Sequence, residues 1–292
     1  MNGILLIDKP SGWTSNDVVQ KLRGILHERR VGHAGTLDPM ATGLLTVFIG
    51  RATRAVEFAE GDSKRYLASL RPGLTTDTQD ITGTTLRESP QRVTREELER
   101  VLPQFTGRQL QIPPMYSAVK MDGQRLYRLA RSGKTVNRPA REITVESLNL
   151  IGPDGEDWQL DIRCSKGTYI RTLCHDIGEA LGCGGCLSAL RRTEAGAFRV
   201  DDAFPLEAVQ EAAWRGEAER LLLPVDSLFR KYPVLTVSGD EEKRVRNGGT
   251  FRSTAQEGPT RLYAENGEFL ALGAVSNSSC RVIKSFFEVE DK

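Results

Sequence analysis

The sequence predicts an α+β protein built from two domains. The chain has 292 residues, and about 150 residues per domain is a fair expectation for globular proteins. Hydrophobic patterns of both helices and strands occur along the chain as far as Leu223, and short strand-like segments dominate after Pro224. These observations place a boundary near Arg230, with a larger domain at residues 1–229 and a β-rich module at residues 230–292.

Composition excludes several broad classes of protein. Hydrophobic residues make up 39% and charged residues 27% of the chain, which is ordinary for a globular protein and rules out bulk disorder. No apolar stretch approaches the roughly 18–20 residues needed to cross a bilayer, and no basic segment precedes the short apolar run near residue 4. Five cysteines in a chain without a secretion signal argue against a disulfide framework. We therefore expect a cytoplasmic protein with no membrane partner.

The first predicted elements are a strand, a helix and a glycine-rich loop. Residues 4–7 form a short apolar run closed by a Pro-Ser-Gly turn, which is typical of a buried strand. Thr14 or Ser15 can cap a helix whose apolar residues recur at helical spacing. Residues 31–43 contain three glycines and a proline without a sustained period, so we expect a loop there, followed by an apolar strand at residues 44–49.

Strand and helix patterns continue to mix in the rest of the larger domain. Residues 64–70 and 160–164 alternate between apolar and other side chains, which predicts two strands. The sequence TREE at residues 94–97 has the spacing of a capping box, so a helix should begin there. A further helix is predicted from Ile170 to a stop at Gly182.

Short strands make up the predicted C-terminal module. Candidate strands lie at residues 234–237, 261–264 and 269–275, and the Asn266-Gly267 pair between the last two predicts a type I′ hairpin turn. A last strand at residues 282–289 would close a small barrel.

The glycine-rich loop carries the first candidate for chemistry, Asp38, within GHAGTLDP at residues 32–39. A carboxylate held in a constrained loop between apolar strands suits a positioned nucleophile or base. A loop aspartate that only caps a turn or a helix is the simpler alternative, and spacing alone favours it. His33 in the same loop could carry a proton. A hydrogen-bonding or stacking role suits His33 better, because no other residue lies at metal-ligand spacing from it.

A second candidate is a zinc site formed by Cys174 and His175 with Cys183 and Cys186. The second CxxC pair of a strong zinc signature is missing, and Cys174 and His175 point to different faces of the expected helix. Small cysteines in the core and at a helix end are therefore favoured, and we expect no metal.

Positive charge is concentrated at residues 114–142, although the net charge of the whole chain is only +1. This stretch holds seven basic and two acidic residues, and Arg125, Arg128 and Arg131 recur every three residues beside apolar side chains. A helix with this pattern would present a row of arginines to phosphate groups. A solvated helix face explains the charge equally well, so both interpretations stay open.

Two further segments, KGTYIR at residues 166–171 and LRRT at residues 190–193, place cations beside aromatic or apolar residues. Ordinary surface charge is the simpler interpretation of both. The chain contains no P-loop, HExxH, GxSxG or strand-GxGxxG-helix motif. The residues alone therefore predict a cytosolic two-domain protein with a candidate RNA-binding surface and one unusual loop aspartate.

Taken together, the motifs of the chain resemble the TruB family of pseudouridine synthases along essentially the whole length. The motifs that carry the resemblance, in chain order, are DKPSGWTS at residues 8–15, GHAGTLDP at 32–39 with ATG at 41–43, KRY at 64–66, TDT at 76–78 with Asp80, PPMYSAVK at 113–120, GTYIR at 167–171 and LRRT at 190–193. The resemblance implies the pseudouridine synthase fold, an α+β fold with a mixed, largely antiparallel sheet and flanking helices, followed by a small PUA-like RNA-binding module. The activity it implies is isomerisation of uridine 55 in the TΨC arm of tRNA to pseudouridine, on a flipped-out nucleotide and without a cofactor.

The resemblance also assigns the residues of the reaction. It implies that Asp38 is the catalytic aspartate, that Arg171 is its counter-charge and that Tyr66 stacks on the target uracil. A positive neighbour is needed because an aspartate in a dry pocket otherwise takes up a proton. Tyr169 and Leu190 are expected to line the pocket.

Substrate binding extends beyond the pocket in the same resemblance. His33 is expected to occupy the space vacated by the flipped nucleotide, and Lys9 to support the catalytic loop beside the substrate. Residues 114–142 correspond to a thumb-like insertion that closes on RNA. The arginines expected to bind RNA there are Arg125, Arg128 and Arg131.

The expected partner is the TΨC stem-loop of tRNA, bound by a monomer without an obligatory protein partner. Two alternatives stay open. One is an RNA-folding chaperone that opens the tRNA elbow with the same cleft, which an Asp38→Asn variant would separate from catalysis. The other is a related synthase directed by guide RNA and partner proteins, against which the short chain argues.

Overall fold

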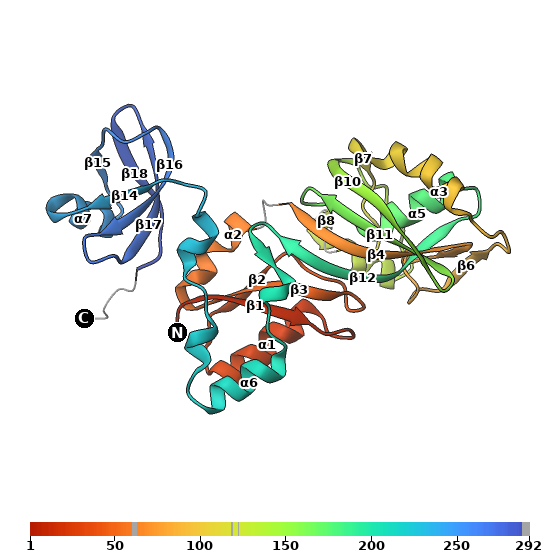
Figure 1. Ribbon diagram of the computed structural model, residues 1–292, viewed down its shortest axis with the longest axis horizontal. Helices are drawn as coiled ribbons and strands as arrows, with labels where there is room; N and C mark the ends of the chain where they lie inside the picture. Colours follow the sequence, from red (N-terminus) through yellow and green to blue (C-terminus); the bar gives the residue numbers. More distant parts are fainter. Residues whose placement is uncertain (60–62, 118, 122, 288–292) are drawn as a thin grey trace.

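Segments far apart in the sequence meet in one large sheet (Figure 1). The structure, a computed structural model, describes residues 1–59, 63–117, 119–121 and 123–287. The strands of this sheet are β1 (Gly3–Lys9), β2 (Val31–Ala34), β3 (Thr42–Ile49), β4 (Lys64–Pro72), β7 (Gly107–Gln111), β10 (Arg141–Asp154), β11 (Asp157–Cys164), β12 (Gly185–Ala195) and β13 (Phe198–Arg199).

The strand order of the large sheet is β1-β3-β12-β4-β11-β10-β7, with β2 beside β3 and β13 beside β12. Neighbouring strands run antiparallel, except that β3 and β12 are parallel over a short pairing of Thr42 with Arg191 and Gly43 with Arg192. The expected α+β fold with a mixed, largely antiparallel sheet is therefore confirmed. The parallel pairing matters because it joins the two halves of the sheet next to the loop that carries Asp38.

Helices cover one face of each half of this sheet (Figure 1). The helices of the described chain are α1 (Ser15–Leu26), α2 (Val56–Ala59), α3 (Arg95–Val101), α4 (Leu126–Arg131), α5 (Ile170–Ala180), α6 (Leu206–Trp214) and α7 (Gly239–Arg246). Short 3-10 turns are η1 (Gly50–Ala55), η2 (Leu102–Phe105), η3 (Val200–Asp202), η4 (Ala218–Leu221) and η5 (Val225–Phe229). The α1 and α6 helices bury their apolar sides against β1 and β3, and α3 and α5 pack on β4, β10 and β11.

Two of these helices begin where the sequence predicts a cap. The Thr14 hydroxyl accepts the Asp17 N–H at 3.1 Å, and the Asp17 carboxylate accepts the Thr14 N–H at 2.9 Å. Thr94 and Glu97 form the same reciprocal pair at the start of α3. Each box satisfies backbone donors that the first turn of a helix leaves without partners. The predicted strands at residues 4–7, 44–49, 64–70 and 160–164 are likewise confirmed as β1, β3, β4 and β11.

The sequence prediction was wrong for residues 31–34, which form β2 rather than part of a loop. Val31 and Ala34 are buried, and the segment pairs antiparallel with β3 along residues 46–49. Pairing with the apolar strand β3 provides hydrogen-bond partners for the backbone of this segment. Its strand conformation was not predicted because the segment belongs to a glycine-rich stretch. The irregular part of the loop is residues 35–41, and Asp38 lies within it.

A second sheet forms the C-terminal module. Its strands are β14 (Val234–Val237), β15 (Thr250–Arg252), β16 (Gly258–Ala264), β17 (Phe269–Ser276) and β18 (Ser279–Ser285), in the order β14-β16-β17-β18-β15. β14 and β16 are parallel, and the other neighbours are antiparallel.

Two expectations for this module were wrong. Only Gly267 of the Asn266-Gly267 pair is left-handed, with φ +86°, because a bulge at Leu262 and Tyr263 shifts the register and lengthens the turn beyond type I′. Among the described strands β14 and β15 are the ends of the order, so the sheet is not closed into the predicted barrel. The chain leaves β18 after Ser285, and residues 288 and 289 of the predicted last strand lie outside the described chain.

Aromatic rings join the module to the larger domain. Phe229, at the end of η5, has ring-centroid distances of 5.4 Å to Phe58, 6.1 Å to Phe269 and 5.7 Å to Phe286. Phe58 belongs to the larger domain, whereas Phe269 and Phe286 belong to the module. Phe229 and Phe286 are buried in one apolar cluster with Ile4 of β1. The two parts therefore share a core.

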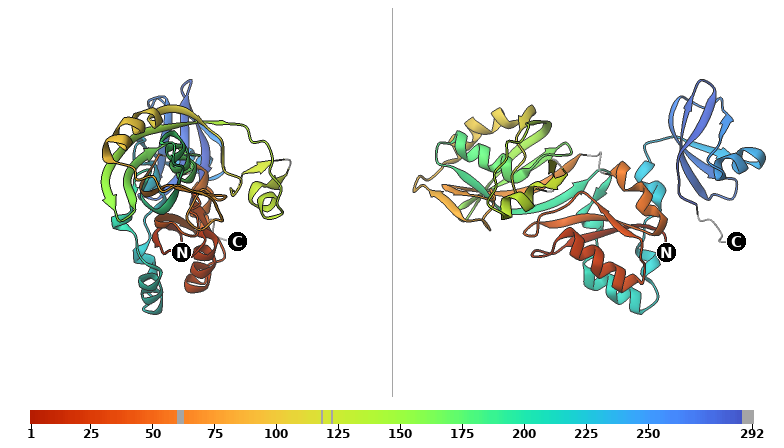
Figure 2. Two further views of the ribbon diagram at one scale, coloured as in Figure 1. Left: turned by 90° about the vertical axis from the view of Figure 1, so that its right-hand side faces the viewer. Right: turned by 180° about the vertical axis from the view of Figure 1, so that it is seen from behind.

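Two short hairpins complete the larger domain. The first consists of β5 (Leu74–Thr76) and β6 (Thr85–Glu88), and the second of β8 (Lys120–Met121) and β9 (Gln124–Arg125), which leads directly into α4. The left view of Figure 2 shows the second hairpin and α4 projecting away from the body of the protein. No helix in the described ranges combines the length and apolar character needed to span a membrane.

Candidate active site

Asp38 and Arg171 form a two-pronged ion pair across 133 positions of sequence. The Arg171 Nε donates to Asp38 Oδ2 at 2.9 Å, and Arg171 Nη2 donates to Asp38 Oδ1 at 3.2 Å. The Arg171 side chain is only 5% exposed, whereas the Asp38 side chain is 36% exposed. The buried Arg171 guanidinium thus fixes the Asp38 carboxylate, which remains partly exposed to solvent. Parallel hydrogen bonds of this kind fix orientation as well as charge.

Two backbone carbonyls complete the surroundings of the Arg171 guanidinium. Nη1 donates to the carbonyl of Thr78 at 3.0 Å, and Nη2 donates to the carbonyl of Tyr116 at 2.8 Å. A second carboxylate, Asp80, lies 3.7 Å from Arg171 Nε and is buried. The sequence assigned no role to these three residues, although the density of threonine and aspartate at residues 76–82 signals a turn stabilised by side chains.

Residues 76–84 form a rigid turn beneath Arg171. Asp80 Oδ1 accepts the Thr78 hydroxyl at 2.8 Å and the Thr82 hydroxyl at 2.6 Å. Gln79 adopts a left-handed backbone with φ +63°, which a residue other than glycine keeps only when its surroundings enforce it. The Gln79 side-chain oxygen accepts the Thr172 hydroxyl at 2.7 Å, so this turn is tied to α5 next to Arg171.

Two buried cations hold the backbone of the Asp38 loop. Lys9 has no exposed surface, and its ammonium donates to the carbonyls of Pro10, Trp13 and Pro39. Arg192 is 1% exposed and donates to the carbonyls of Gly35 and Leu44. Carbonyls on both sides of Asp38 are therefore fixed by cationic donors, which make stronger hydrogen bonds than neutral ones.

The structure corrects one sequence expectation here. Arg171 and Arg192 are buried and are not surface charges, because β12 and α5 turn them inward between elements that lie far apart in the sequence. Lys9 is buried and donates to a carbonyl of the Asp38 loop, which agrees with the expected support of this loop, and its place beside the substrate stays a prediction. Burial lowers the pKa of Lys9 to about 8, an effect that the nearby negative charge of Asp38 opposes.

Aromatic and aliphatic residues expected in the pocket share one apolar cluster. Tyr66 on β4 and Leu190 on β12 are buried in the cluster that also contains Leu37, the neighbour of Asp38 in the chain. Burial raises the pKa of Tyr66, so its phenol keeps its proton near neutral pH. Tyr169 is half-buried, and Gln111 fixes its backbone by accepting its N–H at 2.8 Å and donating to its carbonyl at 3.1 Å.

His33 lies on β2, paired with Val47 of β3. Burial lowers the pKa of His33, and the positive charge of Arg192 adds to this effect. The imidazole is therefore neutral at pH 7, which suits contact with a base or ribose better than the delivery of a proton.

The predicted row of three arginines is not continuous. Arg125 ends β9, and α4 begins at Leu126, because the N–H groups of Leu126 and Tyr127 donate to the carbonyls of Val119 and Ser117 at the root of the hairpin. Arg128 is exposed on α4. The side chains of Arg125 and Arg131 lie outside the described residues.

The cysteines of the second candidate site lie in the core. Cys174, Cys183 and Cys186 are buried, and burial raises the pKa of Cys186 to about 11. Within the part of the chain that the structure describes, no cluster of His, Cys, Asp or Glu residues has the arrangement of a metal site.

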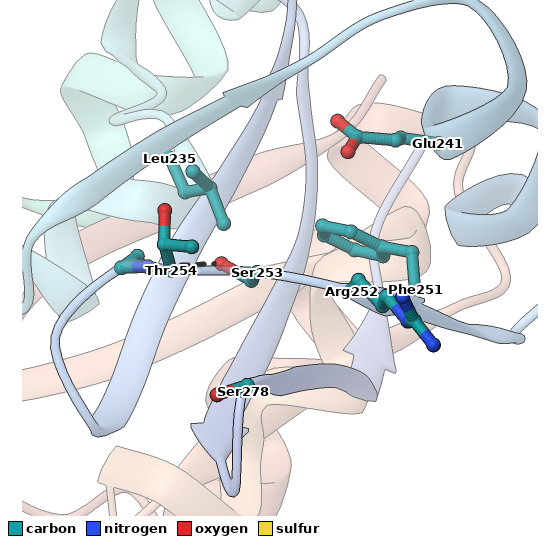
Figure 3. Close-up of a pocket in the computed structure, with 8 residues that line it drawn as sticks. Leu235, Glu241, Phe251, Arg252, Ser253, Thr254 and Ser278 are labelled. Atoms are coloured by element: carbon teal, nitrogen blue, oxygen red, sulfur yellow. Dashed lines mark hydrogen bonds between the residues drawn. The ribbon is translucent and has the colours of Figure 1, made fainter.

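A cavity in the C-terminal module lies apart from these residues. Leu235, Glu241, Phe251 and Ser278 line it together with residues 252–255, as Figure 3 shows. An aromatic ring, a carboxylate and several hydroxyls thus face one hollow of the module, and none of them belongs to the Asp38 site.

The fold is that of a pseudouridine synthase. The model of the N-terminal domain of TruB family pseudouridylate synthases matches residues 23–170, and that of the tRNA pseudouridylate synthase B C-terminal domain matches residues 171–230. The chain belongs to the TruB family, and its enzymatic class is isomerase.

Curated relatives match almost the whole chain. The tRNA pseudouridine synthase B of Azoarcus sp. (strain BH72) is 45% identical over 282 residues, which cover 96% of this chain and 93% of the relative. The tRNA pseudouridine synthase B of Stutzerimonas stutzeri (strain A1501) is 43% identical over 281 residues, which cover 94% and 92% of the two chains.

Solved structures share the fold at lower identity. One is an H/ACA RNP bound to a substrate RNA containing 2′-deoxyuridine, with a TM-score of 0.74 at 23% identity over 98% of this chain and 85% of that chain. Another is a Cbf5-Nop10-Gar1 complex, with a TM-score of 0.74 at 24% identity and the same coverage.

Proposed function

We propose that this protein converts uridine 55 in the TΨC arm of tRNA into pseudouridine, with Asp38 as the catalytic carboxylate. The observation that carries the proposal is the Asp38–Arg171 pair, in which a buried guanidinium holds a partly exposed carboxylate. The names of the relatives, tRNA pseudouridine synthase B, support tRNA as the substrate.

The chemistry needs one carboxylate and no external reactant. The N1–C1′ bond of uridine breaks, the uracil rotates, a C5–C1′ bond forms, C5 loses its proton and N1 gains one, so the reaction changes neither the oxidation state nor the atom count of the nucleotide. Asp38 attacks the nucleotide as its ionised form, and Arg171 keeps that negative charge in place during attack and departure. The reaction proceeds without a cofactor or metal.

The target base must leave the stack of the RNA before Asp38 can reach it. Extrusion of a nucleotide costs a few kcal/mol. We assign Tyr66 to stacking on the flipped uracil, Leu190 and Tyr169 to the walls of the pocket, and His33 to the space that the nucleotide vacates. The neutral imidazole of His33 fits such a place because it introduces no charge into the RNA stem.

Residues 114–142 and the C-terminal module supply the wider RNA surface in this proposal. The hairpin and α4 project from the body, where Arg128 can reach phosphate groups of the stem-loop. We assign residues 1–229 to the catalytic domain and residues 230–292 to a PUA-like RNA-binding domain, whose cavity beside Phe251 offers a stacking wall and hydroxyl groups.

The direct test is pseudouridine formation on an unmodified tRNA transcript, mapped by position, with wild-type protein and Asp38→Asn compared in the presence of a chelator. Product at position 55 with wild type alone is the expected result. Product from Asp38→Asn would remove Asp38 from the chemistry. Tight binding without product from either protein would favour an RNA-folding role or another RNA.

The role of the insertion predicts a change in the salt dependence of binding. Arg128→Ala should weaken tRNA binding and lower the slope of log affinity against log salt by about 1, as expected for one lost phosphate contact. Titrations at several salt concentrations measure this slope. Arg215→Ala, which removes another exposed cation just after α6, is the control and should leave the slope unchanged. Equal slopes for wild type and Arg128→Ala would exclude Arg128 from the RNA surface.

A further inference from the structure

Tyr116 connects the insertion to the catalytic ion pair in two ways. Its backbone carbonyl accepts Arg171 Nη2 at 2.8 Å, on the same nitrogen that donates to Asp38. Its phenol donates to Asp77 Oδ2 at 3.3 Å, on the rigid turn at residues 76–84. One residue at the root of the insertion therefore contacts both the guanidinium and the turn beneath it.

The next residue carries the connection to α4. The Ser117 carbonyl accepts the N–H of Tyr127 at 3.1 Å, inside the first turn of α4. Ser117 is itself buried at this root. An unbroken series of contacts therefore runs from α4, which presents Arg128, through residues 116–117 to Arg171 and Asp38.

The two carbonyls that hold Arg171 differ in how they are fixed. The Thr78 carbonyl belongs to the turn that Asp80, Thr82 and Gln79 stabilise from within. The Tyr116 carbonyl belongs to the segment that precedes the projecting hairpin of β8 and β9. A shift of the insertion therefore acts more directly on the Tyr116 acceptor of Arg171 than on the Thr78 acceptor.

We propose that Tyr116 is a positioning residue that sets the orientation of the Arg171 guanidinium according to the placement of the insertion. When RNA binds and fixes the position of the insertion, the Tyr116 carbonyl is held in hydrogen-bonding contact with Arg171 Nη2. The guanidinium then holds the Asp38 carboxylate in the orientation needed for attack. The phenol–Asp77 hydrogen bond holds Tyr116 in register with the turn while this happens. This inference rests on the proposed function, because it requires that RNA contacts the insertion and that Asp38 is the nucleophile.

Tyr116→Phe is the sharpest test, since it keeps the carbonyl and the ring and removes the phenol hydroxyl that donates to Asp77. The rate constant of pseudouridine formation, measured in a single turnover at saturating tRNA, should fall about tenfold, which is the effect of one hydrogen bond to a charged acceptor. The affinity for fully modified product tRNA should change less than twofold. Ser188→Ala is the matched control, because it removes a hydroxyl–carboxylate bond to Asp157 outside the residues of the site and should leave the rate unchanged.

Two outcomes would overturn the proposal. An unchanged rate constant would mean that Tyr116 does not position Arg171, and an equal loss of rate and product affinity would make Tyr116 an RNA-binding residue. Total pseudouridine is measured separately from its position in the RNA. Product from wild type at a position other than 55 would therefore refute the proposed substrate site without affecting the comparison of Tyr116→Phe with wild type.

Discussion

The three cations around Asp38 are buried and hydrogen-bonded. Lys9, Arg171 and Arg192 are all buried, and they donate to backbone carbonyls or to the Asp38 carboxylate. Buried cations are costly unless hydrogen bonds satisfy them. The three buried cations all lie around the Asp38 loop. Unlike them, the Asp38 carboxylate is partly exposed and is accessible to a substrate.

Removing the guanidinium should damage catalysis far more than RNA binding. Arg171→Ala deletes both donors to Asp38, and the loss of an oriented charged donor at a reacting group lowers kcat by about 100-fold or more. Single-turnover rates and tRNA affinities measured on the same variant separate the two effects. Comparable losses in rate and affinity would instead make Arg171 a binding residue.

Lys9 predicts how the activity depends on pH. Its pKa of about 8 means that it loses its proton as the pH rises through 8, and a neutral amine has two N–H groups for three carbonyl acceptors. The Pro39 side of the loop then loosens, so the single-turnover rate should fall between pH 7 and pH 9. A Lys9→Arg protein, which stays charged in this range, should lack that fall if the interpretation holds.

The stability of the fold should respond to this titration in the opposite direction. The ordinary pKa of a lysine is 10.5, so between pH 8 and pH 10.5 the unfolded chain binds the Lys9 proton more tightly than the folded chain. The contribution of Lys9 to the free energy of unfolding therefore rises with pH across this window. A loss of activity above pH 8 without a loss of urea stability distinguishes loop loosening from unfolding.

At the scale of elements, α5 can carry Arg171 into the site because Gly178 lets the helix approach β12 closely. A Cβ at Gly178 would lie 2.2 Å from the backbone nitrogen of Gly185. Gly178→Ala should therefore lower the free energy of unfolding by about 3 kcal/mol, as measured by urea denaturation. Gly24→Ala, in α1 with no atom near its added Cβ, should instead stabilise the protein by about 0.5 kcal/mol. Equal effects of the two substitutions would contradict the close approach.

Sequence patterns predicted the elements that local interactions determine. The caps at Thr14 and Thr94 act within four residues of the chain, and apolar periodicity was enough for β1, β3, β4 and β11. β10 and β12 were not predicted, although β12 is the strand that joins the two halves of the sheet. Its charged residues hide it, because Arg192 is buried only when the pairing with β4 turns it toward the Asp38 loop.

The candidate site shows the same limit. Asp38 and Arg171 could be assigned from the family motifs, and the structure places them in contact. The contacts of Thr78 and Tyr116 with Arg171 could not be predicted, because in both residues it is the backbone carbonyl that accepts from the guanidinium. Such contacts cannot be predicted from side-chain patterns, because they form only when three segments that are distant in the sequence meet in the fold.

At the scale of the whole molecule, the shared aromatic core predicts that the larger domain and the C-terminal module unfold together. Phe229 is 1% exposed and contacts rings from both parts. Phe229→Ala should lower the free energy of unfolding by about 4 kcal/mol, as measured by calorimetry, which also counts the unfolding transitions. Trp214→Ala, which removes a ring that is 78% exposed, should change it by less than about 0.5 kcal/mol. Two separate transitions in the wild-type protein would show that the shared core does not couple the parts.

The distance along the chain between Asp38 and its partners also has a consequence for biosynthesis. Arg171 follows Asp38 by 133 positions, and Arg192 follows Gly35 by 157 positions. At about 10 residues per second, the ribosome adds Arg171 roughly 13 s after Asp38, and β12 follows later still. The projecting insertion is translated before either arginine. A nascent or truncated chain can therefore expose this insertion, but it gains the ability to isomerise a nucleotide only once β12 has joined the two halves of the sheet.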